Sequence, residues 1–503
     1  MGRFSSAPFH FMSRFHSFHQ TLRRLASLTA LLAATAHADG LPPEVMKALK
    51  AAQIPASQVA VVVQPVEAAA PLVAHQASRA MNPASVMKLV TTYAALDLLG
   101  PAWTWTTGLW LDTAPVDGIL NGNLYLRGNG DPRFAIEHLS TLLRQARTRG
   151  IRQINGDIVL DRSAFDIPGI DPGAFDDKPM RPYNVGPNAL LLNFQSIRFT
   201  LQPDNGRPRV LMETPSEGLR VDNRLQAGDG ACTSNWKDLI QTRLIPENGR
   251  VRLEFTGTYS ALCGERSLNL APLTADEHAN GLIRALWQEL GGQLGGNVRA
   301  GNVPLGARLF TQHESPPLAD AVRDINKFSN NVMARQVFLT LGAESSRDGQ
   351  LTAAHPERAR QRIGQWLTGR GLRFPELEIE NGSGLSRRER ISAGSLNRLL
   401  LDAWKNPVMP EFIASLPIVG IDGTMKKRLT NGEASGRAHI KTGTLDGVKT
   451  AAGYALDAQG RRHAVTFLIN HPRAALGGPA IDALITWVAQ RRSNETPPAL
   501  VND

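Results

Sequence analysis

The chain of 503 residues is 42% hydrophobic and 20% charged, and its formal net charge is +10. One hydrophobic core rarely serves so long a chain, so we expect about two to four domains. The composition is typical of a folded globular protein and argues against disorder. The arginines are scattered, without a run of five like charges or a recognisable nucleic-acid module, so no nucleic-acid partner is predicted.

Residues 1–38 have the order of a secretory signal peptide. Four arginines and no acidic residue accompany a short apolar run, Leu25 to Ala36, which ends in the pattern Ala36-His37-Ala38. The run is shorter than the roughly 20 apolar residues that span a bilayer. We therefore expect export to the periplasm with cleavage after Ala38; the alternative is an ordinary amphipathic first helix.

Loss of this leader would lower the net charge to +6. A mildly basic mature protein is compatible with loose association with anionic wall polymers or lipid head groups, but does not require it. No later stretch is long and apolar enough to predict a transmembrane anchor.

Residues 39–99, which follow the leader, predict a helix, two strands and a second helix. The first helix is expected at Pro43–Ala52, and apolar runs predict strands at Val59–Val63 and Leu72–His75. The second helix is strongly apolar and should end near Leu99. It stops there because Gly100 frees the backbone and Pro101 cannot continue the hydrogen-bond ladder.

From 107 to 306 the pattern changes to short strands, turns and occasional helices. This change predicts a β-rich insertion of one or two small domains. The elements expected here are strands at Ile119–Leu126 and Gly156–Leu160, alternating strands across 195–270, and helices at Ala135–Arg149 and Asp276–Leu290.

Cys232 and Cys263 are the only cysteines. In an oxidising compartment they should form a disulfide, which would close a loop of 31 positions; the alternative is a pair of buried free thiols. The chain-entropy model gives such a loop roughly 3–4 kcal/mol of stabilisation. Neither cysteine has the spacing of a zinc ligand, so no metal site is predicted.

After 306 the helical periodicity returns. The apolar spacing predicts a helix over Leu318–Leu341 that is interrupted near Lys327–Asn331. The remaining expected elements are a helix at His355–Gly371, a strand at Arg437–Thr442, a hairpin of Thr450–Leu456 with His463–Ile469, and a final amphipathic helix at Ala480–Arg491.

Ser85 and Lys88 stand three residues apart at the start of the second helix, so their side chains share one face. A serine hydroxyl becomes a good nucleophile only when a neighbouring base takes its proton, and a lysine with a depressed pKa can be that base. An isolated S-x-x-K is weak evidence, because a capping serine beside a solvated lysine gives the same string. The string even recurs at Ser234 and Lys237, without an apolar helix behind it.

Two later motifs make the interpretation of Ser85 and Lys88 as catalytic residues more specific. Ser329-Asn330-Asn331 has the form S-x-N and lies at the break in a helical region. Lys441-Thr442-Gly443-Thr444 has the form K-T-G and continues a predicted strand. Three motifs in this order, each in its expected structural setting, are typical of an acyl-transferring serine enzyme.

The ordered triple resembles the penicillin-binding proteins and serine β-lactamases. The 244 positions between Ser85 and Ser329 exceed what a compact β-lactamase needs. This gap resembles the class C low-molecular-mass penicillin-binding proteins, the D-alanyl-D-alanine carboxypeptidase/endopeptidase (DacB-type) family. Further stretches resemble the same family: Gly128-Asn-Gly-Asp131-Pro132, Asn381-Gly-Ser-Gly-Leu-Ser-Arg387 and Leu416-Pro-Ile-Val-Gly-Ile-Asp-Gly423-Thr424, although Asn381 stands where Asp is expected.

The resemblance implies a fold of the α/β (α+β) class. A penicillin-binding or serine β-lactamase-like domain, with an antiparallel sheet flanked by helices, would be built from 39–106 and 307–503. The β-rich segment 107–306 would interrupt it.

The resemblance also implies a role for each motif residue. Ser85 would attack the penultimate D-alanine carbonyl and form an acyl-enzyme, with Lys88 as the base. Ser329 and Lys441 would pass a proton to the leaving D-alanine nitrogen, and Asn331 would hydrogen-bond the acyl amide of the substrate. Water would then hydrolyse the ester.

The K-T-G strand would bind the substrate's terminal carboxylate. Thr442, Gly443 and Thr444 form this substrate-binding set, assisted by the charge of Lys441. The backbone N–H groups of Ser85 and Thr444 would form the oxyanion hole. The expected partners are peptidoglycan peptides, with β-lactam antibiotics as covalent inhibitors, and no cofactor is needed.

Alternatives remain at this level. A serine β-lactamase or a non-catalytic wall-binding scaffold would carry similar motifs, whereas an α/β-hydrolase lacks support because no G-x-S-x-G elbow is present. Asp131 is interpreted as a turn cap in preference to a substrate ligand. Trp103, Trp105 and Trp110 are interpreted as packing at the domain boundary in preference to a sugar-binding groove.

Overall fold

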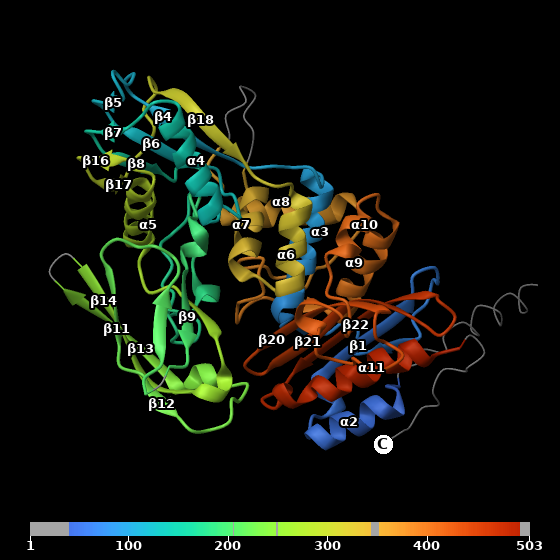
Figure 1. The fold of residues 1–503 in the computed structure, drawn as a ribbon. Helices are drawn as coiled ribbons and strands as arrows, with labels where there is room; N and C mark the ends of the chain where they lie inside the picture. Colours follow the sequence, from blue (N-terminus) through green and yellow to red (C-terminus); the bar gives the residue numbers. More distant parts are fainter. Residues whose placement is uncertain (1–39, 205, 248–249, 344–351, 493–503) are drawn as a thin grey trace, which may run out of the picture.

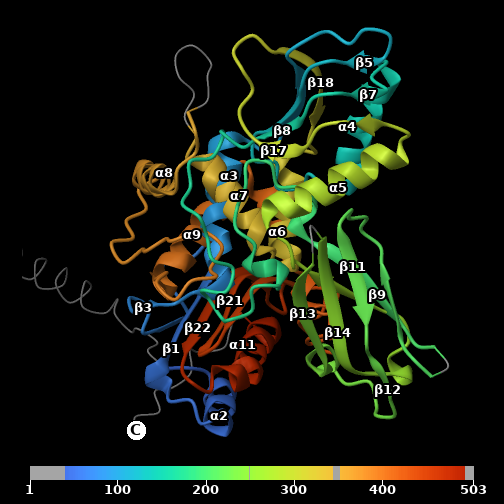
Figure 2. The same ribbon diagram turned by 90° about the vertical axis from the view of Figure 1, so that its left-hand side faces the viewer.

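The computed structural model describes residues 40–204, 206–247, 250–343 and 352–492. The predicted signal peptide and its cleavage site lie outside the described residues. Among the helices of this described part, none is long and apolar enough to cross a membrane. Figure 1 shows a body of sheet and helices on the right and two smaller lobes on the left, and Figure 2 shows the same arrangement from the side.

The body is organised by an antiparallel five-stranded sheet in the order β2-β1-β22-β21-β20. Its N-terminal strand β1 pairs with β22, close to the other end of the chain, with Val59 opposite Ile469. The sheet therefore needs both ends of the sequence. Its strands are β1 (Val59–Pro65), β2 (Val73–His75), β20 (Ala438–Leu445), β21 (Val448–Leu456) and β22 (Arg462–Asn470).

Helices cover both faces of this sheet, which explains why β1 is apolar at successive positions. Val61 and Val63 belong to a core shared with α2 and α11, whereas Ala60 and Val62 face the opposite core. One face carries α2 (Pro43–Ala52) and α11 (Gly478–Gln490). The other carries α3 (Lys88–Leu99), α6 (Leu318–Phe328), α7 (Asn331–Leu341), α8 (Pro356–Gly369), α9 (Ala393–Lys405) and α10 (Met409–Ala414).

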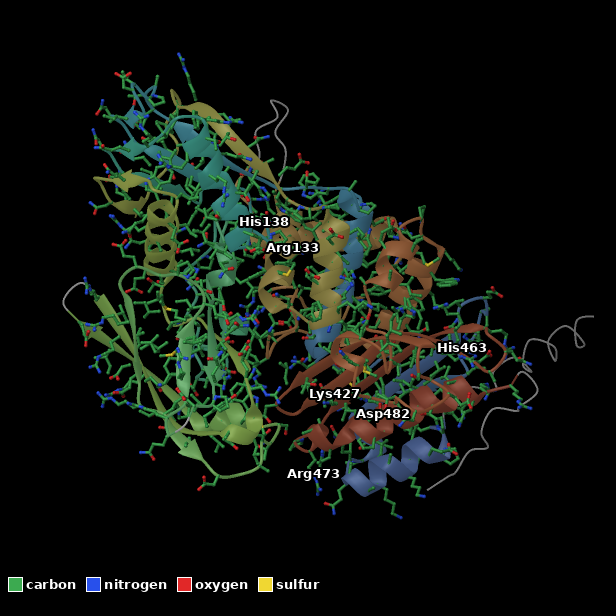
Figure 3. The ribbon with its side chains drawn as sticks, viewed as in Figure 1. Arg133, His138, Lys427, His463, Arg473 and Asp482 are labelled. Atoms are coloured by element: carbon green, nitrogen blue, oxygen red, sulfur yellow. A yellow bond between two sulfur atoms is a disulfide. The ribbon has the colours of Figure 1, made fainter. Side chains whose placement is uncertain are left out.

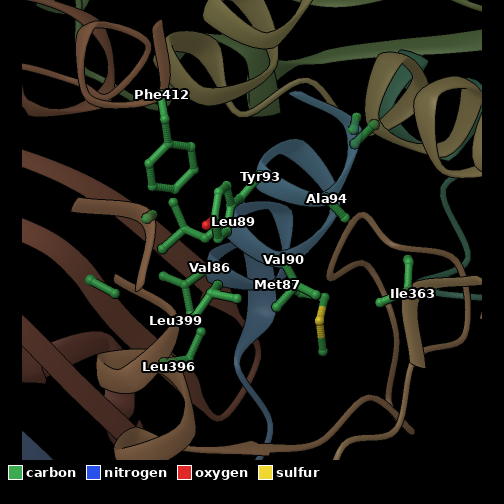
Figure 4. Packing of buried hydrophobic residues seen from close by; sticks show 14 of the residues in the cluster. Val86, Met87, Leu89, Val90, Tyr93, Ala94, Ile363, Leu396, Leu399 and Phe412 are labelled. Atoms are coloured by element: carbon green, nitrogen blue, oxygen red, sulfur yellow. The ribbon is translucent and has the colours of Figure 1, made fainter. Parts of the chain in front are cut away.

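Helix α3 lies at the centre of the second core, and every residue from Lys88 to Leu96 is buried. Figure 4 shows Leu89 and Tyr93 of α3 packed near Phe412. A helix surrounded by other elements has no solvent face, which accounts for the uniform apolar character read from the sequence. A short pairing of β3 (Ala80–Met81) with β19 (Ile391–Ser392) precedes the helix.

The first lobe is an α/β layer whose five-stranded sheet has the order β17-β8-β6-β4-β18. Its core includes apolar residues of α4 and α5. Its elements are β4 (Thr106–Leu111), β5 (Ile119–Leu120), β6 (Leu124–Gly128), α4 (Ile136–Thr148), β7 (Gln153–Ile154), β8 (Ile158–Asp161), α5 (Ala275–Glu289), β16 (Gln293–Leu294), β17 (Val298–Ala300) and β18 (Arg308–Glu314).

The second lobe lies between β8 and α5 in sequence, and its described residues form strands and short 3₁₀ helices but no α-helix. Its smaller core is closed by a Cys232–Cys263 disulfide, as predicted. Its strands are β9 (Ile197–Gln202), β10 (Arg209–Met212), β11 (Leu219–Asn223), β12 (Gln226–Gly228), β13 (Ile240–Glu247), β14 (Arg250–Ser260) and β15 (Arg266–Leu270).

Polar contacts join the first lobe and its flanking loops to the body. The Arg133 guanidinium lies 3.2 Å from the Asp324 carboxylate of α6. Gln336 of α7 accepts the Asn188 backbone N–H and donates to its carbonyl, each at 2.8 Å. Figure 3 shows Arg133 and His138 at this junction.

One predicted strand is wrong in detail and two helices were not predicted. The strand expected at Ile119–Leu126 is two strands, β5 and β6, because Asn121-Gly122-Asn123 forms a turn in which Asn123 bonds the Asp112 carboxylate. Neither α9 nor α10 was predicted. The interruption of the Leu318–Leu341 helix is confirmed, because Ser329 and Asn330 separate α6 from α7.

Candidate active site

Ser85 lies in a 3₁₀ turn, Ala84–Met87, that runs directly into α3. The preceding residue, Ala84, has a left-handed φ of 46°, an uncommon conformation for a residue with a side chain. The turn is fixed from both sides, because the Asn82 side chain accepts the Ala84 N–H and Thr450 donates to the Pro83 carbonyl. Ser85 is therefore held at a defined point above the sheet.

Lys88 is fully buried one turn beyond the serine. Its Nζ lies 3.0 Å from Ser85 Oγ and 2.6 Å from Asn331 Oδ1, and it also donates to the Ser383 carbonyl. Burial, helped by the positive charges of Lys441 and Arg335, holds the pKa of Lys88 well below its usual value. Asn331 begins α7, so the interruption between α6 and α7 brings S-x-N beside S-x-x-K.

Ser329 and Lys441 form the second half of the cluster. Ser329 ends α6 with a left-handed φ of 57°, and its Oγ accepts a hydrogen bond of 2.9 Å from Lys441 Nζ. Lys441 also donates to the Thr442 carbonyl at 2.7 Å. Burial lowers the pKa of Lys441 to about 7. Two amines whose pKa values are lowered by burial therefore lie in one site.

Strand β20 forms an edge of the sheet beside the serine turn. A Cβ at Gly443 would lie 2.3 Å from Thr450 Oγ1 and 2.8 Å from the Ser85 backbone nitrogen, so only glycine permits this approach. Thr442 Oγ1 lies 2.8 Å from Thr424 Oγ1, and Thr444 is exposed. The structure thus brings all three motifs together: Ser85, Lys88, Ser329, Asn331, Lys441, Thr442, Gly443 and Thr444.

Several residues at the site were not singled out from the sequence. Ser383 contributes only a backbone carbonyl, which leaves no sequence signature. Thr424 lies in a stretch that was noticed for its family resemblance alone. Glu389 is fully buried behind Lys88 and Ser383, and a buried acid cannot be recognised without the fold.

The remaining candidates lie elsewhere or have structural contacts. The second S-x-x-K, Ser234 and Lys237, is exposed in the disulfide-bearing lobe. The Asp131 carboxylate accepts the Arg133 N–H at 2.7 Å, as a turn cap does. Trp105 is buried and donates to Thr340 Oγ1 at 3.0 Å, which fits domain-boundary packing.

Comparisons with known proteins agree with this geometry. Residues 42–491 match the model of the D-Ala-D-Ala carboxypeptidase 3 (S13) family. The chain is 29% identical over 435 residues to the D-alanyl-D-alanine carboxypeptidase of Actinomadura sp. (strain R39), covering 82% of this chain and 78% of the relative. It is 26% identical over 400 residues to D-alanyl-D-alanine carboxypeptidase DacB of Haemophilus influenzae, covering 79% and 82%.

Solved structures share the fold. The crystal structure of penicillin binding protein 4 (dacB) from Haemophilus influenzae matches with a TM-score of 0.72 at 23% identity, covering 88% of this chain and 99% of that one. The same protein complexed with a β-lactam matches with a TM-score of 0.68. The fold class predicted from the sequence is confirmed.

Proposed function

The chain belongs to the D-Ala-D-Ala carboxypeptidase 3 (S13) family, and we propose that it hydrolyses terminal D-alanyl-D-alanine bonds through an acyl-enzyme on Ser85. The observation that carries this assignment is the 3.0 Å contact between Ser85 Oγ and the buried Lys88 amine. A serine paired with a desolvated amine is a nucleophile paired with its base.

The contacts of Lys88 support its role as the base. A neutral amine has two N–H groups and one lone pair. The Asn331 amide oxygen and the Ser383 carbonyl accept the two N–H groups, which leaves the lone pair for the Ser85 hydroxyl. As the Ser85 oxygen bonds to the carbonyl carbon, its proton passes to Lys88.

The negative charge that develops on the carbonyl oxygen needs donors. The backbone N–H groups of Ser85 and Thr444 are our candidates, because β20 packs closely against the Ser85 backbone at Gly443. Preorganised donors of this kind stabilise an oxyanion by about 3–4 kcal/mol.

Departure of D-alanine requires a proton on its nitrogen. Lys88 holds the proton taken from Ser85, and Ser329 and Lys441, joined by a 2.9 Å hydrogen bond, would relay that proton to the nitrogen as the C–N bond breaks. Thr442 and Thr444, with Thr424 beside Thr442, offer hydroxyl groups to the terminal carboxylate. Water then attacks the ester, which releases the shortened peptide and restores the Ser85 hydroxyl.

The wider biology follows from the substrate. We propose that the protein is exported, loses residues 1–38, and acts in the periplasm on peptidoglycan peptides, with segment 107–306 as an insertion in the catalytic domain. We further propose D,D-endopeptidase activity on cross-linked peptides, because the same acyl-enzyme forms whenever a D-alanyl bond is the one cleaved.

The test is an assay of the purified mature protein on muropeptides, scored for released D-alanine and for split dimers. D-alanine release is the expected result. Intact monomers and dimers after prolonged incubation with a protein that still binds penicillin would contradict the proposal.

A further inference from the structure

A buried acid lies behind the active site and has no part in the mechanism above. Glu389 has no exposed surface. Its Oε1 accepts three consecutive backbone N–H groups, those of Glu380 at 3.1 Å, Asn381 at 3.0 Å and Gly382 at 3.0 Å. One carboxylate oxygen therefore fixes the start of the loop that runs from Glu380 to Gly384.

The loop held in this way reaches both Ser85 and Lys88. The residue after Gly382 is Ser383, whose carbonyl accepts a hydrogen bond from Lys88 Nζ. Thr91 of α3 holds the Gly382 carbonyl at 2.7 Å. Gly384 has a φ of 79°, and a Cβ there would lie 1.9 Å from the Ala84 carbonyl, so the loop is pressed against the serine turn. A displacement at Glu389 would be transmitted to Ser383.

Glu389 also shares the interior with several buried cations. Burial raises the pKa of its carboxyl group, and the three backbone N–H groups together with Lys88 oppose that rise. Lys88 is surrounded by Lys441 of β20 and by Arg335 of α7, whose guanidinium donates to the Val185 carbonyl at 2.8 Å. The second carboxylate oxygen, Oε2, has no hydrogen-bond partner among the described residues. Oε2 therefore takes no part in holding the backbone.

We propose that Glu389 is a positioning residue for acylation: Oε1 fixes the Ser383 carbonyl that orients Lys88, and the carboxylate charge balances the buried cations. This inference rests on the proposed function of Ser85 and Lys88 and extends it. The two parts of the role can be separated, because glutamine keeps an acceptor oxygen and removes the charge.

The charged groups around Lys88 determine the direction in which Glu389 changes the pKa of this lysine. Glu389 raises the pKa of Lys88, against the lowering by burial, Lys441 and Arg335. Without that charge, the pKa of Lys88 falls further. Because the free amine is the base, activity should then appear at lower pH, and the weaker base should act more slowly on the plateau.

The test compares the wild type with Glu389→Gln, Glu389→Asp and Glu389→Ala in penicillin acylation rate against pH. Glu389→Gln should move the acid side of the pH–rate profile to lower pH. Glu389→Asp keeps the charge, so the acid side of the pH–rate profile should not move. Acylation should be slower, because the shorter side chain holds the loop less well. Glu389→Ala removes both the charge and the acceptor, so it should move the profile as Glu389→Gln does and also lower the plateau rate by about 100-fold.

Glu376→Gln is the matched control, because Glu376 also holds backbone, the Ser392 N–H at 3.1 Å, without facing the amines. It should lower the melting temperature without moving the pH profile. A Glu389→Gln profile that superimposes on the wild type would overturn the proposal, and so would a Glu389→Asp shift equal to that of Glu389→Gln.

A second readout does not depend on turnover. The Lys88 amine can be titrated through its ¹³Cε resonance in lysine-labelled protein, with Lys88→Arg to assign the signal. We expect a lower midpoint in Glu389→Gln. An unchanged midpoint rejects the charge role even if the enzyme assay fails, whereas a missing D-alanine release in the wild type rejects the proposed function alone.

Discussion

The body around Ser85 and the disulfide-bearing lobe handle charge in opposite ways. In the body, Lys88 and Lys441 have no exposed surface, and burial depresses the pKa of both amines. In the lobe, Arg224 and Arg243 pair with Glu254 while their own side chains stay 56% and 71% exposed. One region desolvates its cations and the other leaves them in water.

The difference indicates where the chemistry is. Exposed ion pairs contribute little to stability. A buried amine destabilises the fold but becomes reactive, which is why perturbed pKa values gather at functional sites. The lobe, with its small core and a disulfide, requires no such arrangement.

Removal of the nucleophile should produce the largest effect. Ser85→Ala should abolish labelling by fluorescent penicillin and lower peptide hydrolysis by at least about 1,000-fold, because the other oxygens bonded to Lys88 Nζ in the described part of the chain belong to an amide and a carbonyl, which are not nucleophiles. The melting temperature should hardly change. Gel fluorescence and calorimetry measure both, and normal labelling of the variant would move the assignment to Ser329.

Replacement of the second buried amine should stabilise the body. Lys441 changes its pKa from 10.5 to about 7 on folding, so between those values the unfolded chain binds more protons and wild-type stability rises with pH. Lys441→Met should therefore be inactive but more stable at pH 7, by a few kcal/mol at roughly 1.4 kcal/mol per pKa unit.

This advantage should shrink as the pH rises from about 7 towards 10, because the folded amine is then neutral while the unfolded amine approaches its own pKa of 10.5. Urea unfolding of both proteins across that range provides the measurement. A stability difference that is constant with pH would show that Lys441 is not desolvated as described.

Removal of the disulfide should affect only the lobe. The Cys232→Ala/Cys263→Ala variant loses a closed loop of 31 positions, and its free energy of unfolding should fall by about 3 kcal/mol. Penicillin labelling at 25 °C should be retained, because the active-site contacts lie in the body. A loss of penicillin labelling in this variant would show that the lobe and the active site are coupled.

The second S-x-x-K should give no effect at all. Ser234→Ala should label with penicillin at the wild-type rate, because Ser234 and Lys237 are exposed and Lys237 lies over the Trp236 ring. A comparison of the labelling kinetics of Ser85→Ala and Ser234→Ala therefore tests whether the S-x-x-K string alone is enough, or whether the lysine must also be buried.

The motif residues could be predicted from the sequence because each motif is a short run of neighbouring residues. Ser85 with Lys88, and Ser329 with Asn331, are neighbours that a helix start or a helix break presents together. Helix α9 could also have been predicted, since Ser392 caps it by accepting the Ser395 N–H. Leu396, Leu399 and Leu400 follow at helical spacing.

The supporting shell could not be predicted. Lys88 and Ser383 are 295 positions apart, and the contact involves a backbone carbonyl that any residue could supply. Glu389 reads as one more acid in an Arg-rich loop, and only tertiary packing buries it. Long-range burial, which sets the pKa values of the site, has no local pattern in a single sequence.

The central claim is that the acyl-enzyme on Ser85 serves peptide hydrolysis, and the lifetime of the penicilloyl adduct beside D-alanine release tests it most directly. Both are measured on one preparation, by intact mass after penicillin removal and by D-alanine assay with a D-alanyl-D-alanine peptide. We predict an adduct mapped to Ser85 that lasts minutes or longer, beside repeated D-alanine release. Rapid, repeated penicillin hydrolysis without any D-alanine release would contradict this account.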